Sequence, residues 1–188
     1  MRVFSSSEVR CDLNAVIGRI RGGENMSQKN LAKMFVLLLV VLGALGSALA
    51  QMPNPYGMPI SLENAKRAAA PAMAEAAKNN WNMAVAIVGP AGNLIYYEKM
   101  DNTQLGSAEV AIDKARTAAL FKRPTKALQD ALAAGGDGLR VLGIRGVTPV
   151  EGGIPLVLDG KIVGAIGVSG GTSAQDGQCA KAGADTVK

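Results

Sequence analysis

The chain has 188 residues, 48% of them hydrophobic but only 4% aromatic, which predicts a single domain whose core is built mainly from small aliphatic side chains. It contains no histidine and two cysteines, which excludes histidine-based catalysis, Ser-His-Asp triads, histidine metal ligands and a four-ligand zinc site. The formal net charge of +5 is not gathered into a large patch of lysine and arginine, so we expect no nucleic acid as a partner.

Residues 26–50 have the three parts of a secretory signal peptide. Lys29 and Lys33 precede an uncharged apolar run that begins at Met34, and small residues end the segment at Ala50. The strongly apolar part is shorter than the ~20 residues that a membrane-spanning helix needs. We therefore expect cleavage after Ala50, export to the periplasm or the extracellular space, and no stable membrane anchor.

Residues 1–25 form a polar and mixed extension, which is unusual in front of a signal peptide. We interpret this extension as the product of a start codon assigned too early, with Met26 as the true initiator. Cys11 would then be absent from the exported protein. Cys179 would remain as a single thiol, so no intramolecular disulfide is expected.

A proline-containing spacer over residues 51–60 is expected to lead into one domain over residues 61–188. Ser61 is a candidate N-cap for an alanine-rich amphipathic helix over residues 62–80. Pro71 lies inside this helix. A kink or break is expected there, because proline removes one helix hydrogen bond and clashes with the preceding turn.

The middle of the chain predicts a hairpin followed by two helices. Residues 81–100 hold two β-rich runs joined by the turn sequence Gly-Pro-Ala-Gly-Asn, which is typical of a hairpin. A helix is expected from Ser107, as its N-cap, to near Phe121, because Pro124 cannot continue it. Residues 125–133 predict a short third helix.

The last part of the chain predicts further strands and a closing helix. Residues 141–153 suggest a brief strand and a loop rich in glycine and proline. Residues 154–170 predict a second hairpin that turns at Asp159-Gly160, and residues 173–187 predict a helix. Because hairpins make antiparallel sheets, we expect an α/β (α+β) fold: roughly five antiparallel strands, flanked by helices on both faces.

Three motifs in the expected domain point to a known family. The first is the continuous run from Glu151 to Gly171, followed by Gln175-Asp176 and Ala180 to Ala184. The others are Asp113 to Phe121 with Arg123-Pro-Thr, and Ala84 to Asn93 with Glu98 to Asp101. On these motifs the chain resembles the GlcG/HbpS-like haem-binding family, whose domain is known as haem-degrading and is related to the C-terminal domain of PduO-type proteins. The resemblance implies a profilin-like fold, a homo-oligomer, and haem binding in the secreted members. The family usually has an acidic residue at the end of the first strand of the first hairpin, where this chain has Gly89.

The resemblance also implies a set of ligand-binding residues. Thr117 is a candidate oxygen ligand for haem iron, and the alternative is a helix threonine whose hydroxyl bonds to a backbone carbonyl. The cations near it are candidates to pair with haem propionates, and the alternative is a solvated helix face. The candidate ligand-binding residues are Thr117, Lys114, Arg116, Arg123, Gly152, Gly153 and Ser169.

Other residues in the sequence leave two interpretations open. The glycines of residues 164–171 resemble a phosphate loop, but the strand and helix context of such a loop is missing, so they indicate close packing or the approach of a flat ligand. Tyr96 and Tyr97 alternate across a strand, and the outward phenol is a candidate iron ligand. Cys179 is either an iron ligand or redox thiol, or a small buried hydrophobe. A carboxylate cluster for ferric iron, or else ordinary solvated acids, is expected from Glu98, Asp101, Glu109 and Asp113.

The sequence therefore predicts a secreted haem-binding protein that captures, senses or protects haem. Without histidine, the iron would be held by oxygen or sulfur ligands, and affinity would come from burial of the porphyrin and from cations paired with its propionates. One alternative is a binder or enzyme for a small organic acid, with Arg116 or Arg123 gripping its carboxylate. Another is a purely structural oligomer. A binding module is favoured over a conventional enzyme, with haem degradation left open.

Overall fold

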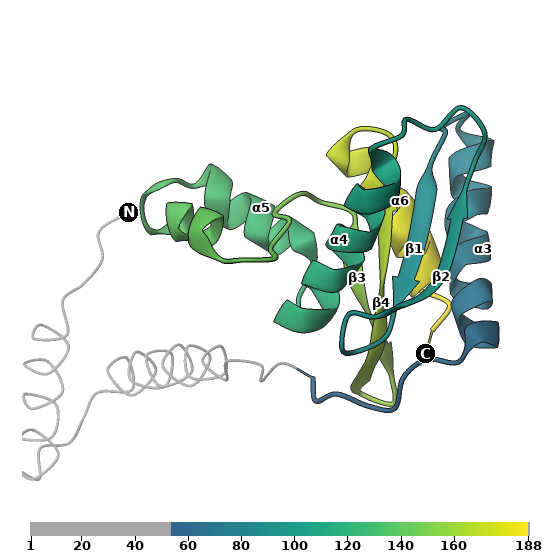
Figure 1. Cartoon of the computed structure of the whole chain (residues 1–188), viewed down its shortest axis with the longest axis horizontal. Helices are drawn as coiled ribbons and strands as arrows, with labels where there is room; N and C mark the ends of the chain where they lie inside the picture. The colour runs from purple at the N-terminus through teal and green to yellow at the C-terminus, as the bar shows by residue number, and fades with distance from the viewer. Residues whose placement is uncertain (1–53, 188) are drawn as a thin grey trace, which may run out of the picture. The chain divides into compact units, whose positions relative to one another are not determined.

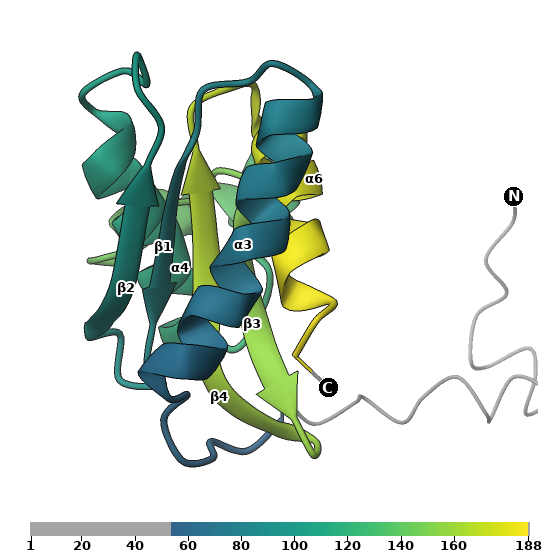
Figure 2. The same cartoon turned by 90° about the vertical axis from the view of Figure 1, so that its right-hand side faces the viewer.

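The computed structural model describes residues 54–187, so the predicted extension (1–25) and signal peptide (26–50) lie outside the described residues. Its centre is a four-stranded sheet in the order β2-β1-β4-β3. Helices α3 and α6 pack together over one face of the sheet, and α4 covers the other face (Figures 1 and 2). The chain is thus an α+β protein with helices on both faces of an antiparallel sheet, as predicted.

The helices and strands follow one another in the expected order. They are α3 (Leu62–Lys78), β1 (Ala84–Val88), β2 (Leu94–Lys99), α4 (Ser107–Phe121), α5 (Thr125–Ala133), the 3-10 helix η1 (Gly136–Gly143), β3 (Gly153–Leu158), β4 (Lys161–Ser169) and α6 (Ser173–Ala184). None of the helices in this part of the chain combines the length and the apolar character that crossing a bilayer requires.

Both predicted hairpins are present. β1 pairs antiparallel with β2, β3 pairs antiparallel with β4, and the central strands β1 and β4 are also antiparallel. The second hairpin turns at Asp159 (φ 50°) and Gly160 (φ 71°). Both residues lie in the left-handed region that a two-residue hairpin turn needs, which explains why an Asp-Gly pair signals this turn.

The expected fifth strand is wrong, because residues 141–143 belong to η1 and residues 144–150 form a loop. Val141 is buried, whereas Leu142, the next residue, is 68% exposed. This apolar run packs beside α5, away from the sheet (Figure 1), so it has no strand edge to pair with. A short apolar run does not by itself distinguish a strand from a short helix.

Two expectations about the helices are also corrected. Ser61 caps α3 as predicted, since its Oγ accepts a hydrogen bond from the Asn64 N–H, but α3 continues through Pro71 without a break. The alanine face of α3 is buried in the core, and this packing compensates for the hydrogen bond that proline removes. Gly106, not Ser107, is the N-cap of α4. Ser107 is buried, with its hydroxyl 3.4 Å from that of Ser169.

Much of the expected spacer is part of the folded domain. Residues 55–60, which we call the N-terminal strap, lie along the start of β4: the Gly57 N–H donates to the Ile162 carbonyl at 2.9 Å, and the Ile60 N–H donates to the Val163 carbonyl at 2.8 Å. Tyr56 reaches α4, where its hydroxyl donates to the Ala119 carbonyl at 3.0 Å. The strap therefore ties the beginning of the domain to both β4 and α4.

Glycine allows α4 to lie very close to the sheet. A Cβ atom on Gly167 of β4 would collide with the carbonyl oxygen of Ala111, and would stand 2.6 Å from the backbone nitrogen of Ala115. Both contacts are with backbone atoms, which a rotamer change cannot move. Gly167 thus serves close packing of the helix on the sheet, in line with the interpretation of these glycines as close-packing residues.

We expect Gly167→Ala to lower the free energy of unfolding by ~1–3 kcal/mol, because the added methyl overpacks the α4–β4 contact. Gly143→Ala is the control, since a Cβ atom there would meet nothing within 4 Å. The control should change stability by less than about 0.5 kcal/mol. Urea unfolding of both variants measures the difference, and equal midpoints would contradict this account of the packing.

Candidate functional site

Lys114, one of the predicted ligand-binding cations, lies in the protein interior. Lys114 is 1% exposed, and its ammonium nitrogen Nζ lies 2.6 Å from Oδ2 of Asp176 in the first turn of α6. The same ammonium donates to the Val168 carbonyl of β4 at 3.1 Å. Burial raises the pKa of Asp176, and the hydrogen bond from Lys114 acts in the opposite direction. This ion pair joins α4, β4 and α6.

The predicted glycines Gly152 and Gly153 surround this ion pair. Gly152 has φ 126°, and a Cβ atom on it would stand 3.0 Å from Nζ of Lys114. A Cβ atom on Gly153 would collide with the carbonyl oxygen of Lys114. Its N–H donates to the hydroxyl of Thr125 at 2.9 Å. The Gly-Gly motif thus allows the start of β3 to lie against α4.

Thr117, the predicted iron ligand, is fully buried one turn after Lys114. Its Oγ1 accepts a hydrogen bond from the Thr148 N–H at 2.9 Å and donates to the Gly146 carbonyl at 3.4 Å. These partners belong to the loop between η1 and β3, not to the preceding turn of α4. In this arrangement the hydroxyl fastens the loop to the helix, and ligation of iron by Thr117 stays a prediction.

The structure brings only some of the predicted site residues together. Lys114, Gly152 and Gly153 are in contact, and Ser169 follows Val168, which bonds to Lys114. Arg116 and Arg123 are exposed and lie apart from this group. Arg116 donates to the Gly92 carbonyl at 3.2 Å, and Arg123 donates to the Phe121 carbonyl at 3.0 Å.

The remaining candidate ligands are also located. Tyr96 and Tyr97 pack on different clusters of the core, as expected for neighbours on a strand, and the hydroxyl of Tyr96 donates to Glu98 at 2.8 Å. Cys179 is fully buried, and burial raises the pKa of its thiol to about 11. A neutral buried thiol fits the interpretation of Cys179 as a small hydrophobe. Within residues 54–187 no three acidic, cysteine or histidine side chains gather closely enough to hold a metal ion.

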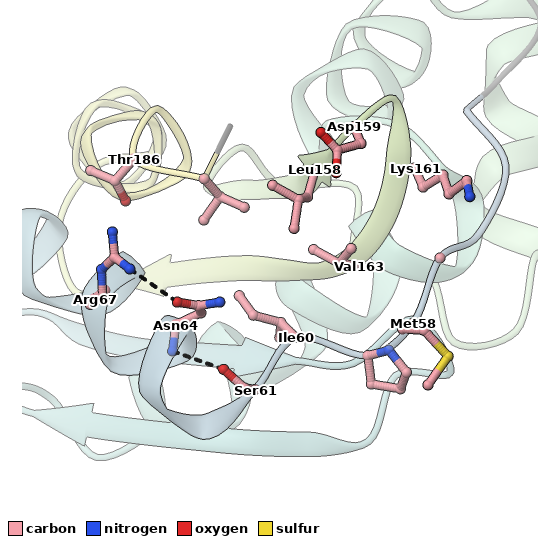
Figure 3. Close-up of a pocket in the computed structure, with 13 residues that line it drawn as sticks. Met58, Ile60, Ser61, Asn64, Arg67, Leu158, Asp159, Lys161, Val163 and Thr186 are labelled. Atoms are coloured by element: carbon pink, nitrogen blue, oxygen red, sulfur yellow. Dashed lines mark hydrogen bonds between the residues drawn. The ribbon is translucent and has the colours of Figure 1, made fainter.

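A cavity of about 580 Å³ lies where the N-terminal strap, the start of α3, the β3–β4 hairpin and the end of the chain meet (Figure 3). Its apolar lining includes Ile60, Leu158 and Val163. Arg67 and Lys161 supply positive charge to its border, and Asp159 supplies one carboxylate. Figure 3 shows Arg67 and Lys161 on opposite sides of the apolar residues.

Sequence reasoning missed this cavity, and none of the predicted site residues lines it. Residues 57–60, which form one wall, were assigned to the spacer. Their sequence, Gly-Met-Pro-Ile, gives no periodic signal, because the strap is held by backbone hydrogen bonds to a strand about a hundred positions later. The charged turn at Asp159 to Lys161 was the one visible signal, and by itself it indicates only a hairpin.

We expect Lys114→Met to lower the free energy of unfolding by ~3–5 kcal/mol, because it leaves the carboxylate of Asp176 buried without its partner. Adding Asp176→Leu in the same chain should restore much of the loss. Lys126→Met is the control, since the ion pair of Lys126 with Asp130 is about half exposed and should contribute less than ~1 kcal/mol. Urea unfolding measures all three, and a Lys114→Met variant as stable as the control would contradict the prediction.

Comparison with known proteins identifies the domain. The family described as haem degrading protein HbpS-like matches residues 60–185. Protein GlcG of Escherichia coli (strain K12) is 40% identical over 95 residues, which cover 50% of this chain and 69% of GlcG.

Solved structures agree with this match. HbpS of Streptomyces reticuli, solved as a double mutant, has a TM-score of 0.65 and 32% identity, covering 70% of this chain and 89% of that chain. PduOC, solved in complex with haem, has a TM-score of 0.63 and 27% identity, covering 70% of this chain and 96% of that chain. The predicted resemblance is confirmed, and the chain belongs to the GlcG/HbpS-like family, that of the HbpS-like haem-degrading proteins.

Proposed function

We propose that this chain is an exported haem-binding protein that captures, senses or protects haem. The observation that carries the proposal is the family match over residues 60–185, which span most of the folded domain. The likeness to PduOC, which was solved with haem, supports it. Haem would supply the iron and the flat conjugated ring, and the protein would supply the pocket and the charges around it.

The described residues fit haem in two respects. The cavity has an apolar lining and cations at its border, which suits a flat ring that carries propionates. The lining side chains that would be able to ligate iron offer oxygen and sulfur, from the carboxylate of Asp159 and the thioether of Met58. Thr117, the oxygen ligand that the sequence proposes, does not line this cavity and would hold iron only at a separate place. Iron held without histidine is therefore part of the proposal.

Self-association is also part of the proposed function. Leu139, Leu142 and Ile144 are 53%, 68% and 41% exposed, and they lie on η1 and the residue after it. Figure 1 shows η1 and α5 standing out from the sheet. Exposed apolar residues gathered on one projecting element are typical of a contact surface. We propose that this element joins copies of the chain in a homo-oligomer.

We expect the purified protein to bind haemin saturably at micromolar concentration, with a shift of the Soret band. Thr117→Val tests the proposed iron ligand, because valine keeps the shape of threonine and removes its oxygen. A changed spectrum of the bound haemin would support ligation by Thr117, and Thr125→Val is the buried control. If haemin gives no saturable shift with the unaltered protein, haem binding is excluded.

Export predicts a defined mature protein. We expect cells that make the full-length sequence to place the protein outside the cytoplasm, with Gln51 as its first residue, because the signal peptide would be removed after Ala50. Intact-mass measurement of the purified protein checks this boundary. A cytoplasmic protein that keeps residues 26–50 would contradict both the cleavage site and the proposed location.

A further inference from the structure

The cavity at the N-terminal strap carries positive charge that the fold itself does not use. Within the part of the chain that the structure describes, no ion pair involves Arg67 or Lys161. Arg67 makes one hydrogen bond, from Nη1 to the amide oxygen of Asn64 at 3.2 Å. Since Asp159 is the only acidic residue in the lining, the three charged side chains leave the cavity with an excess of one positive charge.

Among the described residues, Lys66, Lys99, Arg123, Arg140 and Arg145 also make no ion pair, but none of them lines the cavity. Other cations of the domain have acidic partners. Lys114 is buried against Asp176, Arg116 lies beside Asp113, and Lys126 and Lys181 each pair with an aspartate one turn away. Arg67 and Lys161 instead border a hollow whose centre is apolar. Two unpaired cations at the edge of an apolar cavity form an arrangement that suits an anionic ligand.

The apolar part of the cavity belongs to the main core. Ile60 and Val163 are buried members of that core, and Leu158 and Val187 pack against it. The side chains therefore come from four separate segments that the core itself holds in place. A volume of about 580 Å³ is within the range of small-molecule sites. The first turn of α3, where Ser61 caps the helix, also opens at the cavity.

We propose that this cavity binds an amphipathic carboxylate, with its apolar body against Ile60, Leu158 and Val163. The carboxylate pairs with Arg67 or Lys161, and a ligand with two carboxylates engages both. Asp159 opposes this binding by its charge. The inference deepens the proposed function where the ligand is haem, whose propionates are such carboxylates. It stands independently where the ligand is a smaller organic acid.

The test uses two probes on the purified protein, haemin and sodium decanoate, with affinities measured by calorimetric titration. Arg67→Gln and Lys161→Gln should each weaken binding about three- to tenfold, because each removes one charged partner of the carboxylate. Asp159→Asn should tighten binding about two- to threefold, and asparagine is tolerated in the left-handed turn. Lys66→Gln is the matched control, an exposed cation on the same helix outside the cavity, and should leave binding unchanged.

The outcomes separate the two proposals. If haemin binds and the Arg67 and Lys161 variants weaken it while the control does not, the cavity is the haem site. If only decanoate shows this pattern, the cavity binds a smaller acid. In that case haemin that still binds, equally to every variant, supports haem binding at another site, and haemin that does not bind excludes the proposed function. If haemin binds equally to every variant and decanoate does not bind, the cavity proposal is overturned and haem binding stands. If neither probe binds, both are overturned.

Discussion

The buried ion pair between Lys114 and Asp176 is the interaction on which the arrangement of this domain depends. It lies where α4, β4 and α6 come together, and it satisfies the Val168 carbonyl as well. A buried ammonium is tolerated only when charge and hydrogen-bond partners surround it. This requirement fixes how closely the first turn of α6 and the strand β4 approach α4. Gly152 allows the start of β3 to approach the pair, because a Cβ atom there would stand 3.0 Å from Nζ of Lys114. Gly153 allows the same close approach, because a Cβ atom on it would collide with the carbonyl oxygen of Lys114.

The same interaction explains why one predicted ligand-binding cation takes a different place in the structure. Lys114 falls on the apolar stripe of its helix, between Ala111 and Ala115, and both of these alanines are fully buried. The sequence alone instead indicates a ligand cation or part of a solvated face at Lys114, because its partner, Asp176, lies 62 positions later in the chain. A single sequence cannot show that pairing. The family motifs marked residues that build the domain. The middle of the first motif, residues 158–163, also contributes to the lining of the cavity, together with residues outside the motifs.

Local signals in the sequence predicted the elements, and long-range contacts decided the exceptions. The two hairpin turns, the cap at Ser61 and the end of α4 near Phe121 all follow from neighbouring residues, and all are observed. The prediction of a fifth strand was wrong because Val141 and Leu142 have no strand edge beside them. The prediction of a spacer was wrong because β4 holds the strap in the folded domain. The prediction of Ser107 as a helix cap was wrong because its hydroxyl lies against that of Ser169. Each exception depends on a contact distant in sequence.

The cations of this domain fall into those that pair with acidic side chains within the fold and those that do not. A net charge of +5 spread over a small protein does not indicate a ligand, since most surface cations are simply solvated. The informative distinction is whether a cation without a carboxylate partner also borders an apolar cavity. On α4 and α5 the partners are present, so the charge of Lys114, Arg116 and Lys126 is balanced within the fold. At the cavity Arg67 and Lys161 are exposed cations beside an apolar lining, so a ligand whose apolar body contacts that lining would bring its carboxylate within reach of them. On the proposal made above, the affinity of this histidine-free protein for an acidic ligand would come from pairing charge with apolar burial, and the ligand's metal, where it has one, would be secondary to its carboxylates.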